Sequence, residues 1–281
     1  MKLNNEEYIE QSHLFRAMAT RVEGGESSQE RLKMVREEIL TTTRLPLAID
    51  YLSAELSHSG TMATAMKRMS HYFTPFQTFL IECAESEKSR FDINRAFVIL
   101  DHEARFRTEC TSLAAFFFFQ FETLCRNRLN YASGLDAMSQ DPIYDSVWQG
   151  WLKTIRHKIG IVELADLVYV HSDFYMIRSA AEGLQTETPD PILFGEKEGR
   201  IALANRRKEP MFFFAALQRQ LKYPLIPKLE VKESITDQIP KLQRQLERME
   251  VRIKLLEDEN REKGIDLAQF YKKGDQSTPL Q

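Results

Sequence analysis

Residues 72–107, YFTPFQTFLIECAESEKSRFDINRAFVILDHEARFR, decide the fold class. Thr74 and Pro75 combine a helix-capping residue with a proline suited to the first helical turn, and apolar residues then recur every three or four positions. Asp92 can cap a second helix, whose apolar residues share one face as far as Ala104. This spacing predicts two α-helices joined by a short acidic loop.

The sequence before this stretch carries similar signals for the starts and ends of helices. Helix starts and stops are marked by Asn4 and Asn5, by Gly24 and Gly25 after a helix ending near Val22, by a capping box of Ser27 with Glu30, by Pro46, and by Gly60 followed by Thr61. Six consecutive helices with short loops predict an antiparallel helical bundle over residues 1–110. The fold class predicted for the whole chain is mainly α.

Residues 111–227 form a second region that is also predicted to be mostly helical. Phe116 to Phe119 point around a whole helical turn, which predicts burial on most sides rather than a wedge in a membrane. The apolar run from Leu167 to Val170 fits either a strand or a buried helical turn. Residues 181–192 have the composition of a loop, and helices are expected at about Glu196 to Arg207 and Pro210 to Leu221.

After Pro227 the pattern becomes a heptad repeat, which predicts a short coiled coil over residues 228–262 and a disordered tail over 263–281. Arg252 and Glu257 take g and e positions and can pair between parallel chains, while Asn260 occupies the next core position. The alternative is a long amphipathic helix folded onto its own domain. We call the repeating apolar residues the heptad seam: Ile235, Ile239, Leu242, Leu246, Met249, Ile253 and Leu256.

Composition narrows the function classes. The 281 residues carry a formal net charge of −3 with acids and bases interspersed, so no overall field favours nucleic acid or an anionic membrane. Cys83, Cys110 and Cys125 lack paired spacing, which predicts free thiols in a reducing compartment. No signal peptide is apparent, and the apolar run from Leu113 to Phe119 is far shorter than the roughly 20 residues of a membrane span. These features predict a cytoplasmic protein without transmembrane segments.

No catalytic, cofactor-binding or metal-binding residues are predicted. The six histidines lack metal-ligand spacing, and consecutive helical residues such as Asp101, His102 and Glu103 point about 100° apart and cannot share one ion. Glu82, Glu85 and Glu87 are interpreted as a solvated acidic face rather than an acid–base pair. The densest basic stretch is interpreted as a charged helix face, with nucleic-acid or peripheral membrane binding as the alternative: Arg200, Arg206, Arg207 and Lys208.

Four segments of the first hundred residues follow one another in an order known from a protein family: FRAMATRVEGG, SGTMATAMKRM, YFTPFQTFLIECAESE and FDINRAFVILDHEARFR. In this order and spacing, residues 15–107 resemble the cytoplasmic helical domain of the type II secretion system F family, to which type IV pilus platform proteins are kin. The chain departs from the family at residues 84–88, AESEK, where a Gly-Glu-x-Ser/Thr-Gly motif is usual, and it lacks the following membrane helices. The resemblance implies a six-helix interaction module that contacts an assembly ATPase and other platform subunits.

These observations predict a non-catalytic scaffold or adaptor that binds protein partners and forms a homo-oligomer through its coiled coil. An enzyme of unknown class is the main alternative. Its site would lie in residues 136–227, where aromatic and titratable side chains gather: Trp148, Trp151, His157, Tyr169, His171 and Tyr175.

Overall fold

The computed structural model describes residues 3–20, 27–86, 91–109, 112–182, 191–227, 243 and 246–256. Most of these residues are helical, and their only β-type pairings are the isolated bridges of Ile159 with Val162 and of Ser172 with Phe194. The prediction of a mainly α protein is therefore confirmed.

By their internal contacts the residues form two units, Met1–Leu229 and Glu230–Gln281. The first unit holds the helices α1 to α13, and the second holds a helical segment at residues 246–256. The predicted division of the chain near residue 110 stays a prediction. The predicted disordered tail at 263–281 lies outside the described residues.

Capping residues start and stop the first six helices much as the sequence predicts. Ser27 and Glu30 form the expected capping box at α2, and Thr74 forms a second one with Gln77 at α5. Gly60 ends α3 at φ +74°, a conformation that glycine adopts without strain. The bounds are α1 (Asn5–Thr20), α2 (Ser28–Glu38), α3 (Leu45–Ser59), α4 (Met62–Arg68), α5 (Pro75–Glu85) and α6 (Ile93–Glu109).

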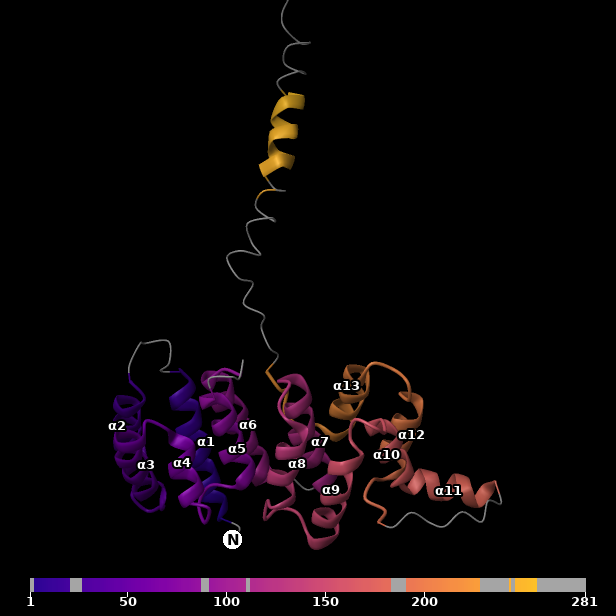
Figure 1. Ribbon diagram of the computed structural model, residues 1–281, viewed down its shortest axis with the longest axis horizontal. Coiled ribbons are helices and arrows are strands. Elements are labelled where there is room, and N and C mark those ends of the chain that lie inside the picture. Colours follow the sequence, from indigo (N-terminus) through magenta and orange to yellow (C-terminus); the bar gives the residue numbers. More distant parts are fainter. Residues whose placement is uncertain are drawn as a thin grey trace, which may run out of the picture. The chain divides into compact units, whose positions relative to one another are not determined.

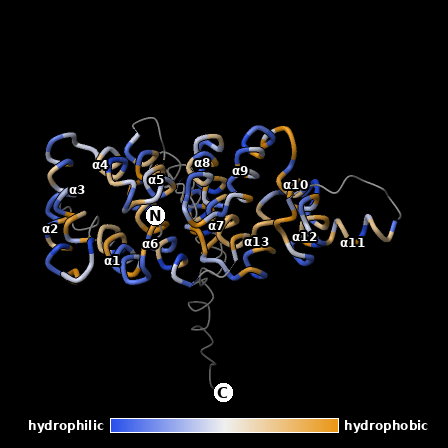
Figure 2. The backbone as a smooth tube through the Cα atoms, turned by 90° about the horizontal axis from the view of Figure 1, so that it is seen from below, coloured by the Kyte–Doolittle hydropathy of each residue, from blue (hydrophilic) through white to orange (hydrophobic). Residues whose placement is uncertain are grey.

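Within the first unit the helices follow one another along its long axis, largely in chain order (Figures 1 and 2). Two helices depart from this order: α1 packs mainly on α6, and α13 returns to pack on α7. Apolar and polar stretches are mixed along most of the helices (Figure 2). The antiparallel six-helix bundle itself stays a prediction.

The remaining helices of the first unit continue the row. The open question at residues 167–170 is settled, because they belong to helix α10. The helix expected to run from Glu196 to Arg207 ends earlier, since the side chain of Asn205 donates to the carbonyl of Ile201 and Arg207 has φ +58°. The bounds are α7 (Leu113–Arg126), α8 (Tyr131–Ser139), α9 (Ser146–Lys158), α10 (Leu164–Val170), α11 (Asp173–Ala181), α12 (Glu196–Ala204) and α13 (Pro210–Leu221).

An aromatic core surrounds α7, as the burial predicted for Phe116 to Phe119 requires. All four rings are fully buried. The ring centroid of Phe117 lies 5.2 Å from that of Trp151, and that of Phe118 lies 5.4 Å from that of Phe194. Contacts at these distances add to the free energy of burying the rings themselves. The prediction of core packing is confirmed.

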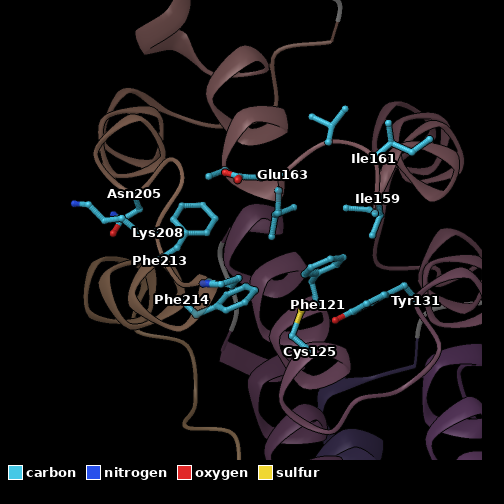
Figure 3. Close-up of a pocket in the computed structure, with 15 residues that line it drawn as sticks. Phe121, Cys125, Tyr131, Ile159, Ile161, Glu163, Asn205, Lys208, Phe213 and Phe214 are labelled. Atoms are coloured by element: carbon cyan, nitrogen blue, oxygen red, sulfur yellow. The ribbon is translucent and has the colours of Figure 1, made fainter.

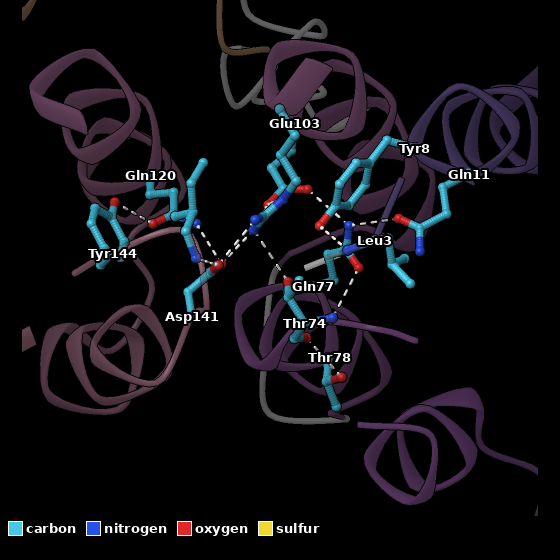
Figure 4. A network of polar contacts seen from close by, with 12 residues as sticks. Leu3, Tyr8, Gln11, Thr74, Gln77, Thr78, Glu103, Gln120, Asp141 and Tyr144 are labelled. Carbon is cyan, nitrogen blue, oxygen red and sulfur yellow. Dashed lines mark hydrogen bonds and ion pairs between the residues drawn. The ribbon is translucent and has the colours of Figure 1, made fainter. Parts of the chain in front are cut away.

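A buried ion-pair network links α6 to the connection between α8 and α9 (Figure 4). The guanidinium of Arg107 donates to Glu103, at 2.8 Å from Nε, and to Asp141, at 2.9 Å from Nη1. These three side chains are at most 2% exposed. Gln77 donates to the second oxygen of Glu103, so hydrogen bonds compensate the desolvated charges. This network ties residues before position 110 to residues after it.

Candidate interaction surface and binding pocket

The second unit presents the described part of the heptad seam on a helix at residues 246–256. Leu246, Met249, Ile253 and Leu256 are 56%, 58%, 55% and 53% exposed. The other seam residues, Ile235, Ile239 and Leu242, lie outside the described residues. Large apolar side chains at heptad spacing and more than half exposed form the kind of surface that a second helix covers.

The remaining positions of this helix are mostly charged, but its opposite face carries two further apolar side chains. Val251 and Leu255 are 60% and 61% exposed and lie one helical turn apart. In the heptad register they take f and c positions, away from the seam. Substitutions of these two residues can serve as a control for substitutions in the seam, because the side chains are also apolar and exposed but lie outside the heptad spacing.

A pocket of about 350 Å³ opens in the first unit, where α7, α10 and α13 converge (Figure 3). Its inner wall is aromatic and includes Phe121, Phe213 and Phe214. The turn between α9 and α10 closes one side, and its Ile161 is 85% exposed. Ligand pockets in proteins have volumes of this order and are mainly apolar.

Two titratable side chains that line this pocket, the half-buried Cys125 and the 41% exposed Tyr131, have raised pKa values. Burial raises the pKa of the Cys125 thiol to about 12. Burial and the neighbouring Cys125 raise the pKa of Tyr131 to about 12 as well. The thiolate is the nucleophilic form of cysteine, and almost none is present at neutral pH. The pocket is therefore built for apolar contact rather than for attack by Cys125.

Two polar side chains at the mouth of the pocket, those of Glu163 and Asn205, make hydrogen bonds within the chain that stabilise the fold. Glu163 accepts a hydrogen bond from the backbone N–H of Arg207 at 3.0 Å, which fastens the α12–α13 turn to the start of α10. Asn205 donates back to α12. A helix from about Pro210 to Leu221 is predicted by the sequence, but no sequence signal joins its Phe213 and Phe214 to Cys125 and Tyr131.

The residues proposed for an enzyme site at 136–227 do not gather around this pocket. Trp148 and Trp151 are buried in the aromatic core. A ring nitrogen of His171 lies 2.8 Å from the carbonyl oxygen of Pro191, and burial lowers the pKa of this histidine. Tyr169 and Tyr175 pack against each other, with ring centroids 5.3 Å apart. These side chains pack the helices α9 to α11.

The basic stretch at 200–208 makes contacts within its own chain. Arg200 pairs with Glu196 along α12. Arg206 pairs with Asp166, and its guanidinium lies 4.4 Å from the ring centroid of Tyr169. These two arginines are thus partly neutralised by acidic neighbours. Only Arg200 lies on a helix, whereas Arg206, Arg207 and Lys208 follow the end of α12 at Ala204, so the interpretation of the whole stretch as one helix face is wrong.

The acidic face near α5 is more than a solvated surface, which corrects one interpretation of the sequence. Glu82 forms an exposed ion pair with Lys67. Glu85 instead accepts hydrogen bonds from the backbone N–H groups of Met62 and Ala63, at 2.6 and 2.9 Å. A carboxylate in this position stabilises the start of α4. Glu87 lies outside the described residues.

Among the described residues, no three His, Cys, Asp or Glu side chains are grouped so that they could hold a metal ion. In the same part of the chain, every helix falls short of the length and apolarity that crossing a bilayer requires. Comparison with protein-family models, with curated proteins and with solved structures finds no match.

Proposed function

We propose that this chain is a non-catalytic scaffold that binds protein partners and associates with further copies of itself through residues 228–262. The exposed heptad seam on the helix at 246–256 is the observation that supports this most directly. Because residues 15–107 resemble a secretion-platform module, the proposal includes secretion or pilus assembly proteins as the partners.

The free energy gained by burying the seam side chains can be compared with the cost of bringing two chains together. Burying one leucine, isoleucine or methionine side chain contributes about 1.5–3 kcal/mol. Joining two chains costs about 4–15 kcal/mol in lost translational and rotational freedom. Eight such side chains, four from each chain, are 53–58% exposed before association and so gain roughly half of that contribution, about 6–12 kcal/mol in all. This is comparable to the cost, and the three seam residues nearer the N-terminus would add to it.

The test compares matched variants of the full chain by light scattering at micromolar concentration. The seam variant carries Leu246→Ser and Ile253→Ser. The control variant carries Val251→Ser and Leu255→Ser, which remove similar apolar surface from the opposite face. We expect an oligomer for the unchanged chain and the control, and a monomer for the seam variant. A monomeric unchanged chain would contradict the proposal.

The pocket beside α7 favours a second candidate function, the binding of a small apolar ligand. Its volume of about 350 Å³ and its aromatic wall support this candidate. An environment-sensitive apolar dye such as anilinonaphthalene sulfonate provides the assay. Ala165 of α10 lines the pocket, so a phenylalanine ring at this position should occupy part of its volume. We expect dye fluorescence to rise with the unchanged chain and to be lower with an Ala165→Phe variant. Equal fluorescence in both would remove this candidate.

A further inference from the structure

Two sides of the pocket beside α7 differ in polarity at its mouth (Figure 3). On one side, the turn between α9 and α10 carries Ile161 and Val162, which are 85% and 37% exposed. Gly160 forms this turn at φ +94°, a conformation that residues with a side chain rarely adopt. On the other side, the turn between α12 and α13 contributes Asn205 and Lys208. The mouth therefore has an apolar edge and a polar edge, and the inner wall beneath them is aromatic.

Two charged side chains line the mouth, those of Glu163 and Lys208. The carboxylate of Glu163 accepts the backbone N–H of Arg207 at 3.0 Å and lies at the start of α10, where the helix dipole favours negative charge. The ammonium group of Lys208 is exposed and, within the described residues, has no acidic partner. Asn205 uses one amide N–H on the carbonyl of Ile201, which leaves the second for another acceptor. The polar edge thus offers a positive charge and a hydrogen-bond donor to an anion.

The interior of the pocket sets the size and chemistry of the rest of the ligand. Ligand pockets span about 300–1,000 Å³. A volume of about 350 Å³ therefore suits one apolar chain rather than a lipid with two chains. Each CH₂ group fully buried there strengthens binding by about four-fold. A charged group is costly in this interior, where burial raises the pKa of the Cys125 thiol to about 12. The chain of the ligand therefore enters the interior, and its charge stays at the mouth.

From the polar edge, the charge of Lys208 and the volume, we infer that the pocket takes a single-chain amphiphile with a carboxylate head, such as a free fatty acid. Its apolar chain lies against the aromatic wall, and its carboxylate lies at the mouth within reach of Lys208 and Asn205. This inference rests on the second candidate function, the binding of a small apolar ligand, since it names the chemical class of that ligand.

Three ligands with the same ten-carbon chain and different head groups test this inference: decanoate, decanol and decyltrimethylammonium. Isothermal titration calorimetry of the full chain at neutral pH measures the dissociation constant of each ligand, below the concentration at which it forms micelles. We expect decanoate to bind more tightly than decyltrimethylammonium, because their head groups meet the ammonium of Lys208 as opposite and like charges. Decanol is the neutral reference.

The variant Lys208→Gln removes the positive charge and keeps a polar side chain at the mouth. An exposed ion pair contributes modestly, so this variant should bind decanoate about two- to five-fold more weakly and decanol as tightly as before. The loss should shrink in concentrated salt, which screens the ion pair. Lys153→Gln is the matched control, because Lys153 is exposed on α9 and does not line the pocket.

The outcomes separate this inference from the candidate function on which it rests. If the unchanged chain bound decyltrimethylammonium as tightly as decanoate, the inference alone would be overturned, because an apolar pocket without a charge preference would remain. Equal losses of decanoate binding in Lys208→Gln and Lys153→Gln would also overturn it, since the head group would then respond only to the net charge of the chain. Binding of none of the three ligands would overturn the candidate function as well.

Discussion

Helix α6 and the helix at residues 246–256 have the same apolar spacing and opposite surroundings. In α6 the apolar residues Ala96, Phe97, Leu100 and Ala104 are at most 1% exposed, because α1 and α5 pack against this helix. In the second helix the described seam residues are more than half exposed. Periodicity therefore predicts a helix and its apolar face, but the coordinates are needed to learn whether the same chain covers that face.

The largest expected effect concerns the buried network at α6. Replacing Arg107 with alanine leaves Glu103 and Asp141 buried without their cation, and removing one partner of a buried ion pair costs about 3–5 kcal/mol. We expect a loss of this size in urea unfolding followed by tryptophan fluorescence. Arg36→Ala is the control, because Arg36 pairs with Asp50 on the surface, and it should change stability little. Equal effects of the two variants would contradict a structural role for the network.

A similar loss is expected in the aromatic core. Phe118 is fully buried and contacts the rings of Phe194 and Phe213, so Phe118→Ala should lower the free energy of unfolding by about 3–5 kcal/mol. Phe212→Ala removes the same atoms from a side chain that is 62% exposed and provides the control. If Phe212→Ala lowered the free energy of unfolding as much as Phe118→Ala, burial of the ring would not explain the loss.

A smaller, pH-dependent effect is expected from Glu103. Burial raises the pKa of this carboxyl group in the folded protein, with the charges of Arg107 and Asp141 acting in opposite directions. A raised folded pKa gives stability that is present below the unfolded pKa and is lost as pH rises through the folded pKa. The stability of the unchanged chain, relative to Glu103→Gln, should therefore fall as pH rises. A relative stability that increased with pH would show that the folded state prefers the ionised carboxylate.

The smallest expected effect concerns the exposed helix. Ile253→Ser should change the free energy of unfolding of the first unit by no more than about 0.5 kcal/mol, because exposed positions contribute little to the stability of their own chain. Thermal unfolding followed by the fluorescence of Trp148 and Trp151 measures this. A loss comparable to that of Phe118→Ala would mean that the seam packs within its own chain, which is the alternative that the sequence left open.

Local signals in the sequence predicted much of the helical structure. The capping box at Ser27, the helix cap at Thr74 and the stop at Gly60 are confirmed, because each depends on residues only a few positions apart. The burial of the aromatic run in α7 is confirmed for a similar reason, since four consecutive rings occupy every side of a helical turn. The resemblance to a secretion-platform domain and the boundary near residue 110 stay predictions.

Features that join distant residues were not predicted. Glu103 and Arg107 are four residues apart on α6, a spacing at which helical side chains meet, but nothing local showed that Arg107 would also pair with Asp141 or that Asp101 would bind Ser12 of α1. Asp141 lies 34 residues from Arg107 in the chain. The pocket likewise combines the second half of α7 with α10 and α13. Such contacts depend on how helices pack, which spacing within a single helix does not determine.

Sedimentation equilibrium of the unchanged full chain over a range of micromolar concentrations tests the central claim most directly. The account predicts a mass that rises with concentration to twice that of the chain, and a mass that stays at one chain for the variant with Leu246→Ser and Ile253→Ser. A single-chain mass for the unchanged protein at every concentration would contradict it.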